Sequence, residues 1–205
     1  MTPAARIAAA IELLGTVEAE GGARAADRCV QTFFRARRYA GSKDRTDITT
    51  RIYAVLRRRA ELDWWLAREG AAPDARGRIL GSLALLDRKP PEYIGALFVE
   101  GAHTAGPLSD GEAALTAKLA AADPAEAPDW ARGGFPEWLK PELERRFGTE
   151  LLPAMQALQE RAPVDLRVNP VKGTGEQALD ALRVLKVPAE PTRLSPVGIR
   201  LGERA

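Results

Sequence analysis

The chain has 205 residues and a mass of 22.2 kDa, enough for one domain or two small ones, since domains typically run to about 100–200 residues. Its 45% apolar and 28% charged residues exclude a disordered chain. No apolar stretch approaches the roughly 18–20 residues that cross a bilayer, and a signal peptide is not expected because acidic residues interrupt the apolar N-terminus. One cysteine and one histidine exclude an internal disulfide and a His/Cys metal cage. We therefore expect a soluble, cytoplasmic protein without a metal.

Apolar spacing predicts helices through the first 120 residues, where no alternating strand pattern occurs. The first helix carries apolar residues from Ile7 to Val17 and ends at Gly21-Gly22, because glycine readily adopts the left-handed conformation at a helix C-terminus. A second helix covers residues 26–34. Ser42 or Asp44 is expected to cap a third, whose apolar stripe runs from Ile48 to Leu56 and which extends or restarts through Leu66. The remaining predicted helices are Arg76–Leu86, Pro91–Phe98 and Ser109–Ala120, the last with a capping box.

The chain changes character after residue 122. Proline, glycine and small residues predict a linker at 123–135, followed by helices at Pro136–Phe147 and Leu151–Gln159. Alternation then predicts a half-buried strand at 164–169. A capping box at Thr174 leads into a helix through Leu185, and short strands follow at 192–194 and 199–201. We therefore predict a mainly α fold: a helical bundle (1–122), the linker, and a small, incomplete α/β unit (136–205).

Charge is unevenly distributed. The net charge is only +2, yet eleven Lys/Arg and three Asp/Glu between Arg24 and Arg59 give that window +8 and leave −6 for the rest. Such asymmetry indicates an anionic partner for one region.

The strongest functional signal is FFRARRYAGSKDRTD at residues 33–47, together with LRRRAELDWW at 56–65. Its cations stand where one predicted helix ends and the next begins. Phosphate binding uses long cationic side chains with exposed N–H groups at a helix N-terminus, and arginine suits bidentate contact with phosphate oxygens. The predicted RNA contacts here are Arg35, Arg37, Arg38, Lys43 and Arg45.

The alternative for this segment is that its arginines solvate helix faces and pair with Asp44, Asp47 and Glu61. The +8 window favours nucleic-acid contact over that alternative. Arg59 falls close to the apolar stripe and is expected to be an ion-pair residue rather than an RNA contact. Trp65 is expected to be buried.

A second cationic group comprises Arg167, Asn169 and Lys172. Arg167 projects from the strand face opposite Leu166, and an asparagine can donate and accept at a base edge or ribose hydroxyl. The alternative is an exposed strand edge with an asparagine turn.

The remaining reactive residues predict no catalytic, cofactor or metal site. The segment 172–175 lies between a strand and a helix, but it lacks the third glycine and the Lys-Ser/Thr ending of a phosphate loop, so a turn with a capping box explains it. Cys29 is expected to be a small buried side chain, and His103 a surface residue in a loop.

Three stretches together resemble the N-terminal region of the RsmB/NOP/Sun family of RNA cytosine-5 methyltransferases. They are TPAARIAAAIELL; the pair RARRYAGSKDR and IYAVLRRRAELDWWL; and FPEWLKPELERRFG followed by APVDLRVNPVKGTGEQALDALRVL. The resemblance implies a helical region similar to the antitermination factor NusB that contacts RNA, then a small RRM-like domain. In the family, a Rossmann-like domain binding S-adenosylmethionine follows.

The resemblance implies that this chain binds and orients RNA, with small-subunit ribosomal RNA the expected partner. The family's glycine-rich cofactor loop and two cysteines are expected beyond Ala205, and Cys29 matches neither cysteine. No activity is therefore expected of the chain alone, and a monomer is expected. Two alternatives stay open: a free-standing NusB-like transcription factor that binds RNA and protein, and a helical protein-interaction module.

Overall fold

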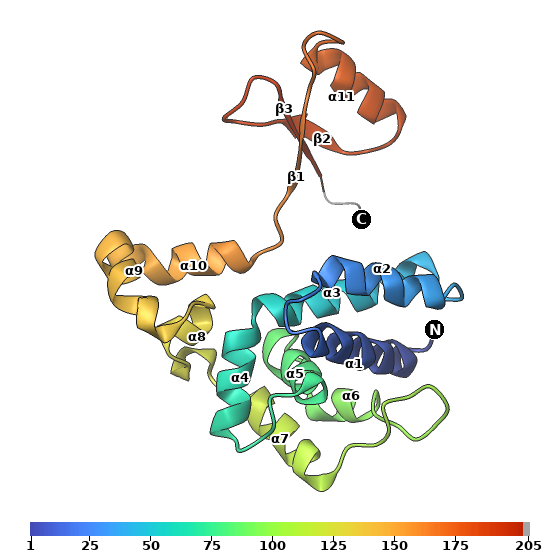
Figure 1. Ribbon diagram of the computed structural model, residues 1–205, viewed down its shortest axis with the longest axis vertical. Helices are drawn as coiled ribbons and strands as arrows, with labels where there is room; N and C mark the ends of the chain where they lie inside the picture. Colours follow the sequence, from blue (N-terminus) through green and yellow to red (C-terminus); the bar gives the residue numbers. More distant parts are fainter. Residues whose placement is uncertain (203–205) are drawn as a thin grey trace. The chain divides into compact units, whose positions relative to one another are not determined.

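A computed structural model describes residues 1–202, which fall into two compact units, Met1–Gln159 and a second that begins at Glu160. The fold is mainly α with one small sheet, as predicted (Figure 1). The helices of the first unit are α1 (Pro3–Ala19), α2 (Ala26–Ala36), α3 (Ser42–Arg57), α4 (Arg59–Arg68), α5 (Ala75–Gly81), the π-helix η1 (Ser82–Leu86), α6 (Pro91–Gly95), α7 (Asp110–Ala121), η2 (Pro124–Glu126), α8 (Asp129–Gly133), η3 (Glu137–Leu139), α9 (Lys140–Phe147), η4 (Gly148–Glu150) and α10 (Leu151–Gln159).

Helix α1 runs through the middle of the first bundle and packs against α2, α3 and α5. The Thr2 hydroxyl accepts from the Ala5 N–H and Pro3 occupies the first turn, a combination that favours a helix start. The helix ends before Gly21 and Gly22, both with positive φ, which confirms the predicted stop. On the predicted apolar face Ile7 and Leu14 are buried, whereas Val17 is only partly buried, and Leu13 beside that face is fully buried.

The predicted helix Arg76–Leu86 is present as two pieces, α5 and the π-helix η1. At the junction Ser82 is buried; its hydroxyl donates to the Ile79 carbonyl and accepts from Arg51 Nη1. Side-chain hydrogen bonds of this kind are invisible to apolar spacing. Cys29 and Trp65 are buried in the same core, as predicted.

Residues 123–135, predicted as a linker, fold onto the first unit. Ala127, Ala131 and Phe135 are buried, and α8 packs against α4 and α10. The prolines and glycines that suggested a linker instead set helix ends: Pro128 precedes α8, and Gly134 follows it in the left-handed region. The compact units therefore divide between Gln159 and Glu160.

The second unit comprises β1 (Val164–Arg167), α11 (Gly175–Val184), β2 (Ala189–Pro191) and β3 (Gly198–Leu201). The strands form an antiparallel sheet in the order β1-β3-β2, with Asp165 opposite Arg200 and Leu166 opposite Ile199. Thr174 and Gln177 form the predicted capping box of α11.

Two expectations for this unit are wrong. The strand predicted at 192–194 lies three residues earlier, because Thr192 closes a turn in which its hydroxyl donates to the Ser195 carbonyl. The first strand is also expected to bury one face, but all four residues of β1 are exposed. The apolar side chains of Val164 and Leu166 are 51% and 41% exposed. Among residues 160–202, only Ile199 is a buried apolar side chain, at 2% exposure.

Candidate nucleic-acid interface

The turn between α2 and α3, residues 37–41, and the helix ends on either side of it carry the predicted cations. Ala40 of the turn is buried, and Arg45 Nε donates to the Ala40 carbonyl at 2.9 Å. The predicted capping of α3 differs in detail: Gly41 is the N-cap residue, and the Asp44 carboxylate accepts from the Gly41 N–H at 3.2 Å. The turn is thus fixed by contacts on both sides.

The carboxylates nearest the turn are neutralised by groups outside the predicted set. Asp44 accepts from the N-terminal ammonium at 3.1 Å and pairs with Arg6 Nε at 3.0 Å. Arg6 also pairs with Asp47. The hydrogen bond from the N-terminal ammonium is the main cause that holds the pKa of Asp44 below its ordinary value. These two carboxylates are therefore unavailable to the predicted RNA contacts.

The five predicted cations fall into two groups. Arg35, Arg38 and Lys43 are exposed, and among residues 1–202 none has a carboxylate partner. Arg37 pairs with Glu12 and lies 3.8 Å from the centroid of the Phe33 ring. Arg45, bonded to the Ala40 carbonyl, lies 5.6 Å from the Phe34 ring centroid. The first group is free to meet an anion, and the second is partly used by the fold.

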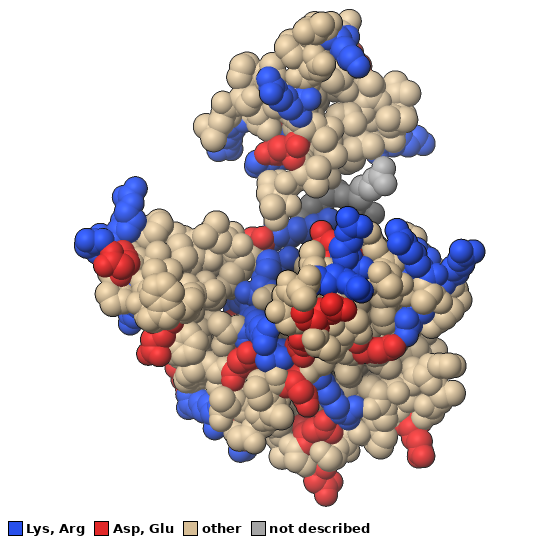
Figure 2. All heavy atoms as spheres, viewed as in Figure 1, with Lys and Arg blue, Asp and Glu red and all other residues tan. Residues whose placement is uncertain are grey.

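Three of these arginines surround one concavity, which we call the arginine hollow. It has a volume of about 460 Å³ and is lined by Val30, Gln31, Phe34, Arg35, Arg38 and Arg45. Figure 2 shows Lys and Arg side chains gathered over α2 and α3. Gln31 and Phe34 were not among the predicted contacts. Their spacing to Arg35 places these three on one face of α2, a signal that the sequence did contain, whereas Arg38 lies in the turn beyond the end of the helix.

The second predicted group lies at the end of β1 and in the turn that follows. Arg167 and Lys172 are exposed. Asn169 Oδ1 accepts from the Val171 N–H at 3.0 Å, which closes the turn and leaves its amide N–H groups for other partners. Two residues before Arg167 on β1, Asp165 forms an ion pair with Arg200 of β3 at 2.8 Å. Residues 160–205 contain no Phe, Trp or Tyr, so this segment cannot stack bases on aromatic rings as an RRM sheet does.

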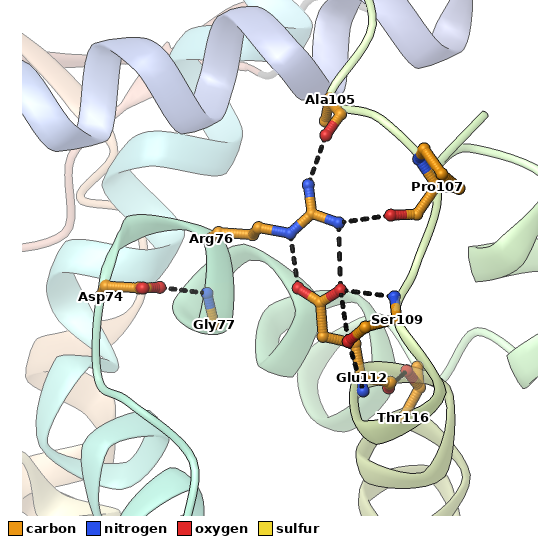
Figure 3. Close-up of polar contacts among 8 residues, drawn as sticks. All are labelled: Asp74, Arg76, Gly77, Ala105, Pro107, Ser109, Glu112 and Thr116. Carbon is orange, nitrogen blue, oxygen red and sulfur yellow. Dashed lines mark hydrogen bonds and ion pairs between the residues drawn. The ribbon is translucent and has the colours of Figure 1, made fainter. Parts of the chain in front are cut away.

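Other arginines of the first unit are consumed by the fold. The Arg76 guanidinium donates to the carbonyls of Ala105 and Pro107 and to the Glu112 carboxylate (Figure 3). It also lies 4.9 Å from the Phe98 ring centroid. Glu112 also accepts from the Ser109 N–H at 2.8 Å. Arg76 thereby fixes the loop of residues 99–108 to the start of α7.

Arg78 is 5% exposed and contacts Glu18 and Asp63, each at 2.6 Å. Arg59 also lies 3.5 Å from Asp63, which confirms its predicted role as an ion-pair residue. Hydrogen bonds from Arg78 to these carboxylates raise its pKa, against the opposing and largest effect of burial. These arginines are therefore structural.

The reactive side chains gather at no metal centre within residues 1–202, where no group of three His, Cys, Asp or Glu could hold an ion. His103 is exposed in a loop, as predicted. No helix in the described part of the chain is long and apolar enough to span a membrane.

Residues 135–205 match the family described as Methyltr_RsmF/B-like, ferredoxin-like domain. The predicted resemblance is confirmed over this segment. No curated protein sequence matches the chain.

A solved structure shares the fold. The crystal structure of PH0851 is similar to this protein with a TM-score of 0.59 and 16% sequence identity, over 100% of this chain and 49% of PH0851. The chain thus spans about half the length of that relative. The likeness extends through both compact units, whereas the family match starts at Phe135, within the first.

Proposed function

We propose that this chain binds and positions RNA for an S-adenosylmethionine-dependent ribosomal RNA (cytosine-5) methyltransferase. The observation that carries the proposal is the arginine hollow, whose rim cations are unpaired with carboxylates among the described residues while nearby Asp44 and Asp47 are neutralised by Arg6. The match of residues 135–205 to an RsmF/B-like domain supports a methyltransferase context.

The hollow suits a phosphate backbone. Arg35, Arg38 and Arg45 offer planar guanidinium groups that can contact phosphate oxygens bidentately. Lys43 stands in the first turn of the 16-residue helix α3, where backbone N–H groups lack intrahelical acceptors and favour an anion. Arg37 lies beside them, with its charge shared with Glu12. The first four would hold the backbone of the RNA, and Arg37 would contact the strand with the N–H donors that Glu12 leaves free.

In the second unit, Arg167, Asn169 and Lys172 would line the approach to the catalytic domain. Their exposure and the free amide N–H groups of Asn169 support that role. The expected partner is small-subunit ribosomal RNA, bound by a monomer in the cytoplasm.

The residues present do not fit the cofactor. The turn between β1 and α11 offers it no free backbone N–H groups at residues 172–174, because hydrogen bonds within the turn and the capping box occupy that backbone. The N–H groups of Lys172 and Gly173 donate to the Asn169 carbonyl, and that of Thr174 donates to Gln177 Oε1. We therefore assign no residue of this segment to S-adenosylmethionine.

The test is RNA binding by the 205-residue protein, measured by fluorescence anisotropy at increasing salt. Contacts from Arg35, Arg38, Lys43 and Arg45 would give a slope of log K against log salt of about −2.8, at about 0.7 per phosphate, or a roughly 50-fold loss from about 50 to about 200 mM salt. Binding that is absent or independent of salt would contradict the proposal.

A charge-reversed variant tests the location. Arg35→Glu/Arg38→Glu should weaken binding by more than about tenfold, because it removes two cations and adds two anions at the hollow. Arg145→Glu/Arg146→Glu makes the same charge change on the exposed surface of α9 and should change affinity by less than about twofold to threefold. Equal losses in both variants would place the interface elsewhere.

The free-standing NusB-like factor and the protein-interaction module are weaker candidates. The family match at 135–205 supports a methyltransferase relation that neither alternative requires. The interaction module also predicts that charge reversal leaves RNA binding unchanged, so the same experiment separates it from the proposal.

A further inference from the structure

A second concavity borders the same turn on the side of α1. We call it the alanine hollow. Its volume is about 380 Å³, and its floor includes Ala5, Ala8 and Ala9 of α1. Glu12, Arg37, Tyr39 and His103 also line it. The hollow therefore lies between the cationic turn and the loop of residues 99–108.

Tyr39 is the unusual member of this lining. Its side chain is 70% exposed, although it directly follows Arg38 of the arginine hollow and precedes the buried Ala40. An aromatic ring left in solvent contributes little to the fold, but its face can stack an unpaired base. The ring thus stands next to the cations that would hold the backbone of a strand.

The opposite wall is held in place by the fold. Arg76 bonds the carbonyls of Ala105 and Pro107, and Thr104 Oγ1 donates to the Gly101 carbonyl at 2.8 Å. Within this anchored loop His103 adopts a φ of +64°, a backbone conformation that few non-glycine residues take. The alanine hollow is therefore bounded by a second ring on a fixed support.

We propose that the alanine hollow takes one unpaired nucleobase of an RNA strand, stacked on Tyr39 over the small side chains of α1. This inference rests on the proposed function, because the strand would be the one whose phosphates contact Arg35 and Arg38. The small alanine side chains admit a flat ring, and Glu12 and Arg37 at the rim can accept from and donate to a base edge. His103 closes the far side.

Single-stranded RNA is the favoured form of this ligand. The bases of a duplex are stacked on one another and do not present a face to a protein ring. A strand that passes from the arginine hollow across the turn would place its backbone on cations and a splayed base on Tyr39. The protein should therefore prefer an unpaired strand to a duplex of equal length.

The experiment measures binding of the 205-residue protein to a fluorescein-labelled adenosine dodecamer and to linear polyphosphate of similar charge. Tyr39→Ala should weaken dodecamer binding about 5- to 150-fold, the range for loss of one stacked base. It should leave polyphosphate binding and the salt slope unchanged. Tyr39→Phe should bind the dodecamer like the original protein.

A matched control is Trp138→Ala, which removes a side chain that is 77% exposed in the same unit but lines neither hollow. It should bind the dodecamer normally. Unchanged dodecamer binding by Tyr39→Ala would overturn the base site, and so would an equal loss toward polyphosphate, because that loss indicates a displaced turn. The proposed function survives both results if Arg35→Glu/Arg38→Glu still weakens binding by more than about tenfold. If the original protein does not bind the dodecamer, both proposals are overturned.

Discussion

Arginines serve opposite purposes at two places in the helical unit. On α5, Arg76 and Arg78 direct their guanidinium groups at carbonyls and carboxylates of the protein. At the α2–α3 turn, Arg35 and Arg38 have no carboxylate partner within residues 1–202. Arginines thus stabilise the fold on α5, whereas at the α2–α3 turn their charges remain available to another molecule.

The difference arises from where the acidic residues lie. Glu18, Asp63 and Glu112 lie within reach of the α5 arginines, whereas Asp44 and Asp47 are paired with Arg6. A count of basic residues therefore overestimates the charge offered to an anion. The binding surface is set by the cations that have no carboxylate partner, so substitutions that remove these ion pairs test the comparison.

The largest expected effect is at Arg78. Arg78→Ala leaves Glu18 and Asp63 without their buried cation, and loss of one partner of a buried ion pair costs about 3–5 kcal/mol of unfolding free energy. Urea denaturation followed by circular dichroism measures the loss. Arg59→Ala removes an exposed partner of the same Asp63 and should cost less than about 1 kcal/mol. Equal costs would show that burial does not distinguish the two arginines.

The next effect is at Arg76. Arg76→Ala removes charge-assisted hydrogen bonds to Glu112 and to two carbonyls, so we expect the unfolding free energy to fall by about 2–3 kcal/mol. Hydrogen exchange in residues 99–108 should rise, because the loop loses its anchor. Arg145→Ala, in an exposed pair with Glu142, should cost less than about 0.5 kcal/mol. A protected loop in Arg76→Ala would contradict the anchoring role.

The same contact predicts a pH dependence. The hydrogen bond from Arg76 is the main cause that lowers the pKa of Glu112 in the folded protein. A carboxylate with a lowered pKa stabilises the fold fully above its unfolded pKa and loses that contribution as the pH falls through the folded value. The stability gap between the original protein and Glu112→Gln should therefore be largest near about pH 7 and shrink toward about pH 3. A constant gap would contradict the pKa direction.

Local sequence signals predicted much of this fold, and long-range contacts account for most of what they missed. The capping boxes at Ser109 and Thr174 and the glycine end of α1 depend on residues within one helical turn, so the sequence displays them directly. The folding of residues 123–135 onto the bundle depends on Ala131 and Phe135 meeting distant helices. The proline, glycine and small residues of this segment are typical of a linker, so composition alone predicted one.

In the candidate site, too, local features could be predicted from the sequence and long-range contacts could not. The cluster of cations at a helix–turn–helix junction could be found from spacing, as could the shared face of Gln31 and Phe34. The pairing of Arg37 with Glu12, 25 positions earlier, could not. The capture of Asp44 by the N-terminus, 43 positions away, is equally hidden. RNA contact by each of these residues stays a prediction.

A smaller effect is expected at Arg6, which contacts no proposed ligand. Arg6→Ala frees Asp47 and leaves Asp44 paired with the N-terminal ammonium alone, so the lost positive charge would weaken attraction of a phosphate backbone at the turn. We expect RNA affinity to fall about two- to fivefold, the effect of an exposed charge interaction. Arg6→Lys should retain most of the affinity. Unchanged or increased affinity would contradict a role for Arg6 in setting the charge of the surface.

The smallest expected effects are those of Arg37→Ala and Arg38→Ala, which should change different quantities. Arg37 already pairs with Glu12 and lies over Phe33, so Arg37→Ala should lower the unfolding free energy by about 0.5–1 kcal/mol. It should leave the slope of log K against log salt unchanged. Arg38→Ala should have the reverse pattern, with unaltered stability and a slope reduced by about 0.7, because an unpaired cation releases a counterion from RNA. If both variants reduce the slope equally, the ion pair with Glu12 does not prevent Arg37 from contacting an RNA phosphate.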